Sequence, residues 1–202
     1  RGMICNPYAL FLYLLEKEEY QDYTHIWVLD DFEDNRKQIE KYEKYPNVRF
    51  VKYKSKEYCK DLATVKYLVN NVSFPSYFLK REGQVLIDTW HGTPLKNMGF
   101  DIPGANISQG NTARNLLSAD YIVSSGPYMT KTAYKDSYKM QNLYEGTILE
   151  EGFPRNDKLF ENNRAEIIRK LQSYGVNAEA DKKIILYAPT WRGEQYSQPD
   201  TD

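Results

Sequence analysis

The chain has 202 residues, of which 41% are hydrophobic and 27% charged, and its formal net charge is −1. Such a length fits one large domain, or one domain and part of a second, and the composition is typical of a soluble globular protein. The near-neutral charge argues against a broad basic surface for nucleic acid. No apolar run approaches the roughly 20 residues of a membrane span, and no basic-then-apolar signal segment opens the sequence.

Helix and strand patterns alternate through the first part of the chain. Asn6 and Pro7 are typical of an N-cap followed by the first helical position, so a helix is predicted over 7–20. Short apolar runs between turn residues predict strands. Strands are predicted at 25–31, 47–55 and 67–73, and helices at 34–45 and 56–66.

The same alternation continues beyond a turn or short helix at 75–83. Strands are predicted at 84–92 and 120–126, at the start of 146–157 and at 182–193, with helices at 112–119, from Pro127 onward and at 157–175. Alternating strands and helices predict an α/β fold, a Rossmann-like parallel sheet with helices on both faces.

Residues able to support chemistry follow the predicted strands. They lie at Asp88 to Thr93, Ser124 to Gly126, Gly152 to Asn156 and Pro189 to Arg192. In open parallel sheets, ligands bind beyond the carboxyl ends of the strands. The sequence therefore predicts a site at this edge.

The string WHGTPLK is the most suggestive of these segments. Gly92 gives the backbone freedom and leaves room for a close ligand. Pro94 can begin a helix with Thr93 as its cap, and the N–H groups of that helix start, together with Lys96, would form a phosphate site.

His91 is one of two histidines in the chain. Histidine exchanges protons near neutral pH, so His91 could take a proton from an attacking hydroxyl, with Asp88 orienting its ring. The alternative is a histidine bonded to the backbone of a turn. His25, which precedes a strand, is expected to be structural.

Two later turns carry candidate anion ligands. Ser125 and Gly126 can cradle an anion before a helix, or Ser124 to Gly126 can simply cap it. Arg155 can bind a phosphate bidentately, although capping and packing between domains explain its position equally well.

The last segment, APTWRG, offers Thr190, Trp191 and Arg192. Trp191 and Arg192 could stack on and neutralise a nucleotide diphosphate, although Trp191 could equally belong to a core. No metal-ligand spacing of cysteine and histidine occurs, and Cys5 and Cys59 are expected to be free thiols.

Five strings in one order, DTWHGTPLK, GFD, SADYIVSSGPY, EEGFPRNDKLF and ILYAPTWRG, resemble the CDP-glycerol glycerophosphotransferase family of teichoic acid synthesis. The resemblance runs from about Asn6 to Arg192. It implies the N-terminal half of a glycosyltransferase-B-type fold and the beginning of the second domain. Residues 1–153 would face the acceptor, and residues 154–202 would hold a linker helix and the first strand of the donor domain.

The resemblance also implies residue roles. His91 falls on the histidine proposed as general base. The other matched positions are expected to bind substrate: Asp88, Gly92, Thr93, Lys96, Asp101, Ser125, Gly126, Arg155, Thr190, Trp191 and Arg192. No metal and no cofactor is implied.

The implied reaction is a displacement at the β-phosphorus of a CDP-alcohol, CDP-glycerol or CDP-ribitol, which acts as donor substrate. A hydroxyl of a lipid-linked glycan or growing polymer attacks, and CMP leaves. The protein is expected to act peripherally at the cytoplasmic face of the plasma membrane of a bacterium, without nucleic acid.

This sequence departs from the family pattern, because the family's second histidine lies further along the donor half. The first strand of the N-terminal domain also has no counterpart here. We therefore expect an incomplete donor site and little transfer by this chain alone. The alternatives are a nucleotide-sugar glycosyltransferase of the same architecture and a non-catalytic module that binds a surface polymer.

Overall fold

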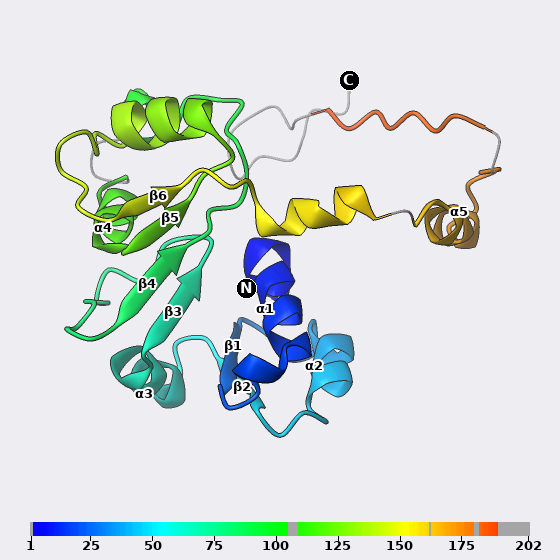
Figure 1. Cartoon of the computed structure of the whole chain (residues 1–202), viewed down its shortest axis with the longest axis horizontal. Coiled ribbons are helices and arrows are strands. Elements are labelled where there is room, and N and C mark those ends of the chain that lie inside the picture. The colour runs from blue at the N-terminus through cyan, green and yellow to red at the C-terminus, as the bar shows by residue number, and fades with distance from the viewer. Residues whose placement is uncertain (1, 105–108, 162, 180–181, 190–202) are drawn as a thin grey trace. The chain divides into compact units, whose positions relative to one another are not determined.

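The computed structural model describes residues 2–104, 109–161, 163–179 and 182–189 (Figure 1). The chain divides into two compact units, Arg1–Leu159 and Phe160–Asp202. This boundary lies close to the predicted one after residue 153. The assignment of the two parts to acceptor and donor domains stays a prediction.

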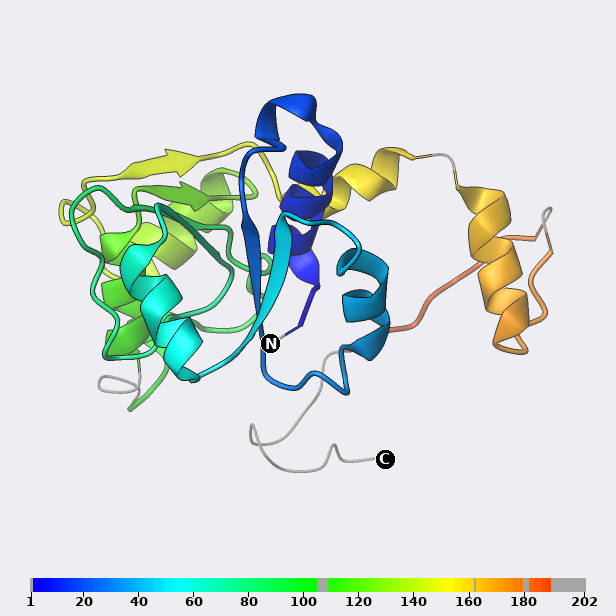
Figure 2. The same cartoon turned by 90° about the horizontal axis from the view of Figure 1, so that it is seen from below.

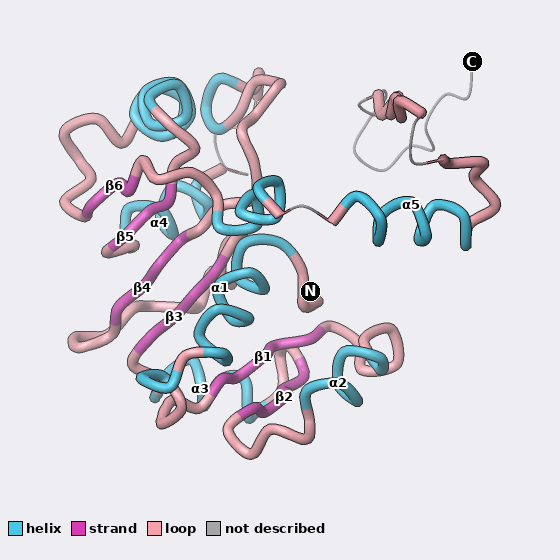
Figure 3. The backbone as a smooth tube through the Cα atoms, turned by 45° about the vertical axis from the view of Figure 1, so that its right-hand side comes forward, coloured by secondary structure: helices cyan, strands magenta, loops and turns pink. Residues whose placement is uncertain are grey.

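The strands of the first unit form two parallel sheets, where a single sheet was expected (Figure 3). One pairs β1 (His25–Leu29) with β2 (Val48–Lys52). The other has the order β3-β4-β5-β6. Its strands are β3 (Tyr67–Asn70), β4 (Val85–Asp88), β5 (Tyr121–Val123) and β6 (Thr147–Leu149). All neighbouring strands are parallel, so the predicted strand direction is confirmed.

Two hydrophobic cores lie on opposite faces of the smaller sheet. Because side chains alternate along a strand, Ile26 and Val28 of β1 pack on the main core beside the larger sheet. Trp27 and Leu29 face a second core under α1. The apolar run of this strand is therefore explained by burial on both faces.

Helices connect the strands (Figures 1 and 2). The α-helices of this unit are α1 (Cys5–Glu16), α2 (Arg36–Tyr42), α3 (Lys56–Thr64) and α4 (Gly110–Ser118). Shorter or irregular elements are η1 (Glu18–Tyr20), η2 (Gly99–Asp101), the π-helix η3 (Met129–Ser137) and η4 (Pro154–Phe160).

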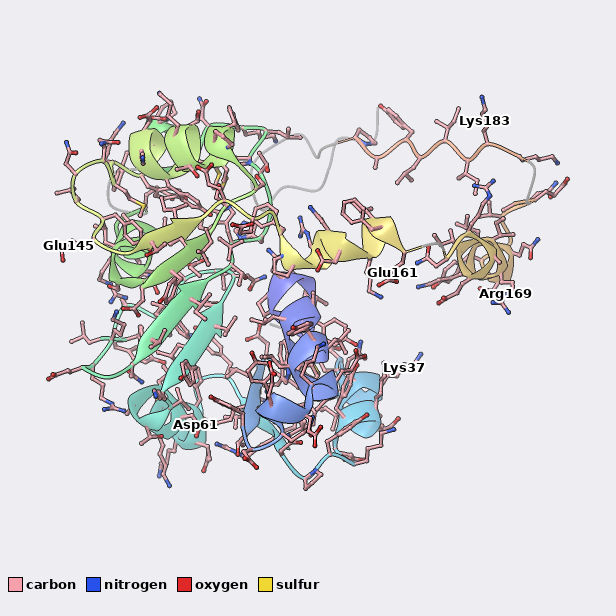
Figure 4. All side chains as sticks on the ribbon, in the orientation of Figure 1. Lys37, Asp61, Glu145, Glu161, Arg169 and Lys183 are labelled. Atoms are coloured by element: carbon pink, nitrogen blue, oxygen red, sulfur yellow. The ribbon has the colours of Figure 1, made fainter. Side chains whose placement is uncertain are left out.

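Helix α3 shows how local sequence fixes these elements. The Ser55 hydroxyl accepts the Tyr58 N–H at its start, a favourable N-cap. Tyr58 and Leu62, four positions apart, are buried on one face. On its outer side Asp61, labelled in Figure 4, accepts two hydrogen bonds from Arg49 of β2, at 2.7 and 3.0 Å.

Two predicted helices differ from those observed. The first helix begins at Cys5, with Ile4 at the N-cap, and ends at Glu16. Asn6 therefore lies inside the first turn, where a tertiary role described below replaces capping. The helix predicted over 157–175 is divided between η4 and α5 (Arg164–Ser173), and Asn163 takes the N-cap position of α5, which asparagine favours.

The last predicted strand, 182–193, is not formed in its described part. Residues 182–189 are irregular. Ile185, Leu186 and Tyr187 are strongly exposed there. A strand needs a neighbour to pair its backbone groups, and this segment pairs with none of the described strands.

Candidate functional site

The carboxyl ends of β3 and β4 meet at one edge of the larger sheet. The Thr89 N–H donates to the Asn70 carbonyl at 2.7 Å, which extends the pairing past the end of β4. At the neighbouring pair of strands, the Gly152 N–H donates to the Ser124 carbonyl at 3.1 Å. Three of the predicted strand-end segments, those that follow β4, β5 and β6, are thus brought to the same edge (Figure 3).

His91 lies just beyond β4 with an exposed side chain. Its Nδ1 is 2.7 Å from the Asn71 carbonyl oxygen. Because a carbonyl oxygen can only accept, Nδ1 carries the hydrogen in this bond, and the neutral ring keeps its lone pair on Nε2. The ring is thus bonded to the backbone of a turn, which is the alternative that the sequence left open. The same bond leaves the lone pair of Nε2 able to accept a proton.

The Trp90 ring packs against one face of the His91 ring. The two rings stack with centroids 4.6 Å apart and planes at 24°. Trp90 is buried, and its indole meets Tyr134 and Tyr138 edge-on. Its φ of +48° lies in the left-handed region, which costs a non-glycine residue roughly 1–2 kcal/mol. Surrounding contacts must therefore hold this conformation.

Asp88 is one of those contacts and does not orient the His91 ring as predicted. Its side chain is 3% exposed, and Oδ1 accepts the Trp90 N–H at 2.8 Å. Burial raises the pKa of Asp88 to about 7, and the bond from Trp90 opposes that rise. Asp88 instead stabilises the turn through the Trp90 N–H, and the Asn71 carbonyl, which no sequence motif indicates, orients the ring.

The buried carboxyl group predicts a pH-dependent stability. Folded Asp88 keeps its proton up to about pH 7, whereas an aspartate in an unfolded chain loses it near about pH 4. Between these values the folded state binds more protons, so the contribution of Asp88 to the free energy of unfolding falls as pH rises. Asp88→Asn keeps an acceptor for Trp90, and we expect it to be more stable than wild type at pH 8 and nearly equal at pH 4. Urea unfolding at both pH values measures this, and a difference that does not change with pH would contradict it.

Thr93 and Ser125, two of the predicted substrate-binding residues, lie side by side. Their hydroxyl oxygens are 2.7 Å apart, which links the loop after β4 to the loop after β5. The helix expected at Pro94 is absent, and the chain runs irregularly from there to η2. Leu95 is 91% exposed, so this segment buries no apolar face that would stabilise a helix. The predicted phosphate site at a helix start is therefore wrong, and Lys96 lies on an exposed loop.

The turn at Ser124 to Gly126 precedes the π-helix η3. The buried Ser124 hydroxyl donates to the Gly126 carbonyl at 2.9 Å and accepts from the Thr130 hydroxyl at 2.9 Å. These bonds stabilise the turn that precedes the helix. The N-cap residue of η3 is Tyr128, and no side chain caps it, so Ser124 does not have the capping role that the sequence left open. Ser125, in contrast, is exposed and faces Thr93.

Arg155 lies beside Gly92, which no sequence spacing could show. A Cβ added at Gly92 would be 3.3 Å from Arg155 Nη2, and Gly92 has φ +150°. The Arg155 guanidinium also donates to Cys5 Sγ at 3.1 Å and lies 5.8 Å from the centre of the Phe153 ring. The GFPR turn therefore places a permanent positive charge next to the segment that carries His91.

Asp101 does not join this group. Asp101 accepts from the Ser137 hydroxyl at 2.6 Å and from Lys139 at 3.2 Å, and these bonds hold η2 against the end of η3. Hydrogen bonds from Ser137 and Lys139 lower the pKa of Asp101. Thr190, Trp191 and Arg192 lie outside the described residues.

Among the described residues, no group of three or more histidine, cysteine, aspartate or glutamate side chains is placed to hold a metal ion. Within the same part of the chain, no helix is long and apolar enough to cross a membrane.

The α/β fold with parallel sheets places the chain in a structural class that includes solved structures of known proteins. The wall teichoic acid polymerase TagF, in a histidine-to-alanine variant, matches with a TM-score of 0.76 at 30% identity, over 98% of this chain and 47% of that chain. A histidine-to-asparagine variant of TagF soaked with CDPG matches with a TM-score of 0.75 at 29% identity, over 98% and 47%. The predicted α/β, glycosyltransferase-B-like fold is confirmed by this likeness.

The whole chain, residues 1–202, matches the family described as CDP-Glycerol:Poly(glycerophosphate) glycerophosphotransferase, and the chain belongs to that family. It is 34% identical to the teichoic acid poly(glycerol phosphate) polymerase of Bacillus spizizenii, over 95% of this chain and 48% of that protein. It is 32% identical to the teichoic acid glycerol-phosphate transferase of Staphylococcus aureus, over 94% and 47%. The chain thus spans about half the length of these relatives.

Proposed function

We propose that this chain supplies the acceptor-side part of an enzyme that transfers glycerol phosphate, or ribitol phosphate, from a CDP-alcohol to a hydroxyl group. The observation that carries the proposal is the His91 ring, whose Nδ1 is bound by the Asn71 carbonyl while Nε2 keeps its lone pair. Family membership supports the reaction class. A teichoic acid ribitol-phosphate primase, 26% identical over 68% of this chain, keeps the ribitol alternative open.

In the proposed reaction the acceptor hydroxyl attacks the β-phosphorus of the CDP-alcohol. His91 Nε2 takes the hydroxyl proton, the new P–O bond forms as the bond to the CMP oxygen breaks, and CMP leaves. Such a base contributes typically about 10²–10⁴-fold in rate. Because the ring is stacked on Trp90 and bonded to Asn71, Nε2 is oriented before the substrate arrives.

Arg155 supplies the positive charge in this proposal. The pentacoordinate phosphorus of the transition state carries more negative charge on its oxygens than the substrate does, and a guanidinium that is already in place stabilises that charge. Its position beside Gly92 supports the assignment, since Gly92 has no side chain to separate the guanidinium from the segment after His91. Thr93 and Ser125 are proposed to position the substrate through their exposed hydroxyl groups.

The acceptor is proposed to be a lipid-linked glycan or a growing phosphodiester polymer. Such an acceptor is anchored at a membrane, so we place the intact protein peripherally at the cytoplasmic face of the plasma membrane. No cofactor is proposed: the donor is a substrate, and Arg155 provides the charge stabilisation.

The proposal is tested by donor choice in the intact protein. CDP-glycerol, CDP-ribitol and UDP-sugars are offered with a lipid-linked acceptor, and the released nucleotide is identified. CMP release from a CDP-alcohol is expected. Release of UDP would instead establish a nucleotide-sugar glycosyltransferase, and binding of the polymer without any release would establish a binding module.

A further inference from the structure

Asn6 is fully buried in the first turn of α1 and contacts two segments that are distant in sequence. Its Nδ2 donates to the Thr89 carbonyl at 2.9 Å and to the Trp90 carbonyl at 3.0 Å. Its Oδ1 accepts the Arg155 backbone N–H, in a longer bond of 3.4 Å. Both amide hydrogens and the amide oxygen are therefore used, all three on backbone groups.

The two carbonyl bonds explain how Trp90 keeps its left-handed conformation. Successive residues of an extended strand direct their side chains and carbonyls to opposite sides, so one amide could not bind two consecutive carbonyls there. With Trp90 at φ +48°, the Thr89 and Trp90 carbonyls both reach Asn6 Nδ2. Asn6 thus offsets the cost of the conformation that directs the chain into His91.

The third bond joins this turn to the GFPR turn. Arg155 is held at its backbone by Asn6 and at its guanidinium by Cys5 Sγ, the residue before Asn6. The first turn of α1 therefore sets where the base and the cation lie relative to each other.

We propose that Asn6 is a positioning residue, which fixes His91 and Arg155 in register by binding the backbone of both turns through one side-chain amide. The expected effect on kcat rests on the proposed function, whereas the expected effect on the position of the His91 ring rests on the geometry alone. Misplacement of a catalytic group by about 1 Å can cost on the order of 10²-fold in rate.

The chain contains a matched control for this amide. Gln84 is also buried, its Nε2 donates to the Leu62 and Val65 carbonyls at 2.9 and 2.8 Å, and its Oε1 accepts the Arg81 N–H at 3.0 Å. The bonding pattern equals that of Asn6, but Gln84 precedes β4, at the opposite end of the strand from His91. Asn6→Asp and Gln84→Glu each replace two donors by a carboxylate facing two carbonyls.

The test compares both variants in the intact protein, with their thermal unfolding measured alongside. We expect Asn6→Asp to lower kcat by about 10²-fold with little change in KM for the CDP-alcohol, and Gln84→Glu to leave kcat near the wild-type value at a similar loss of stability. Equal losses of kcat in the two variants, or none in Asn6→Asp, would overturn the inference. If Asn6→Asp does not fold, Asn6→Ser, which keeps one hydroxyl donor, takes its place.

A second readout does not depend on turnover. The ¹⁵N spectrum of neutral His91 shows which ring nitrogen carries the hydrogen, and we expect Asn6→Asp, but not Gln84→Glu, to weaken the preference for Nδ1–H. If the wild-type protein uses no CDP-alcohol, the proposed function fails, and this spectrum alone decides the positioning role. An unchanged His91 tautomer in Asn6→Asp would then refute it.

Discussion

His91→Ala is expected to reduce transfer from the CDP-alcohol by about 10²–10⁴-fold while the protein stays folded. The loss follows from the removal of Nε2, which is proposed to accept the proton of the attacking hydroxyl. Stability should change little, because the His91 side chain is exposed. Initial rates of CMP release, together with urea unfolding, measure both effects.

His25→Phe is the control for this variant, since it removes the chain's other imidazole. His25 lies at the start of β1, edge-on to Phe11 with ring centroids 5.4 Å apart, and burial lowers its pKa. We expect its replacement to leave the transfer rate near wild type. Added imidazole should partly restore His91→Ala, as a diffusing base would, and near-normal turnover by His91→Ala would remove the assignment.

Arg155→Gln is expected to lower kcat by about 10²–10³-fold, the typical effect of removing one preorganised group that stabilises transition-state charge. Arg155→Lys should recover only part of this loss, because an ammonium group lacks the planar fork that binds two phosphate oxygens. Among the described residues Arg155 forms no salt bridge with a carboxylate.

Arg49→Gln separates this effect from the general loss of an arginine. The Arg49 guanidinium binds both carboxylate oxygens of Asp61, at 2.7 and 3.0 Å, and so joins β2 to α3. We expect a small change in stability and a normal rate, since exposed ion pairs contribute little. If Arg49→Gln slowed the reaction as much as Arg155→Gln, charge stabilisation by Arg155 would not be supported.

The places of β1 to β6 along the chain and their parallel direction could be predicted from the sequence because short apolar runs and turn residues are local signals. Thr93, Ser125 and the loops that carry them follow from the same pattern, since parallel strands end at one edge of a sheet. Helix ends were predicted less well. Pro94 has the local signature of a helix start, but the residues after it have no core to pack on, and tertiary packing rather than propensity stabilises most helices.

Contacts between distant segments could not be predicted from the sequence. Asn6 has the signature of an N-cap, yet its amide binds the backbone of residues more than eighty positions away. Asn71 orients His91 through a backbone carbonyl, a group that every residue has and that no motif identifies. Asp88 lies on the strand face that points into the core, so burial rather than sequence distance decides its role.

His91 is proposed to act through Nε2 because Nδ1 is held by the Asn71 carbonyl. The most direct test is a two-dimensional ¹⁵N spectrum of the histidine rings, recorded on wild type and on His91→Ala to assign the signals. The structure predicts that neutral His91 has its hydrogen on Nδ1 and none on Nε2. A His91 signal from the tautomer protonated at Nε2 would contradict the proposed general base.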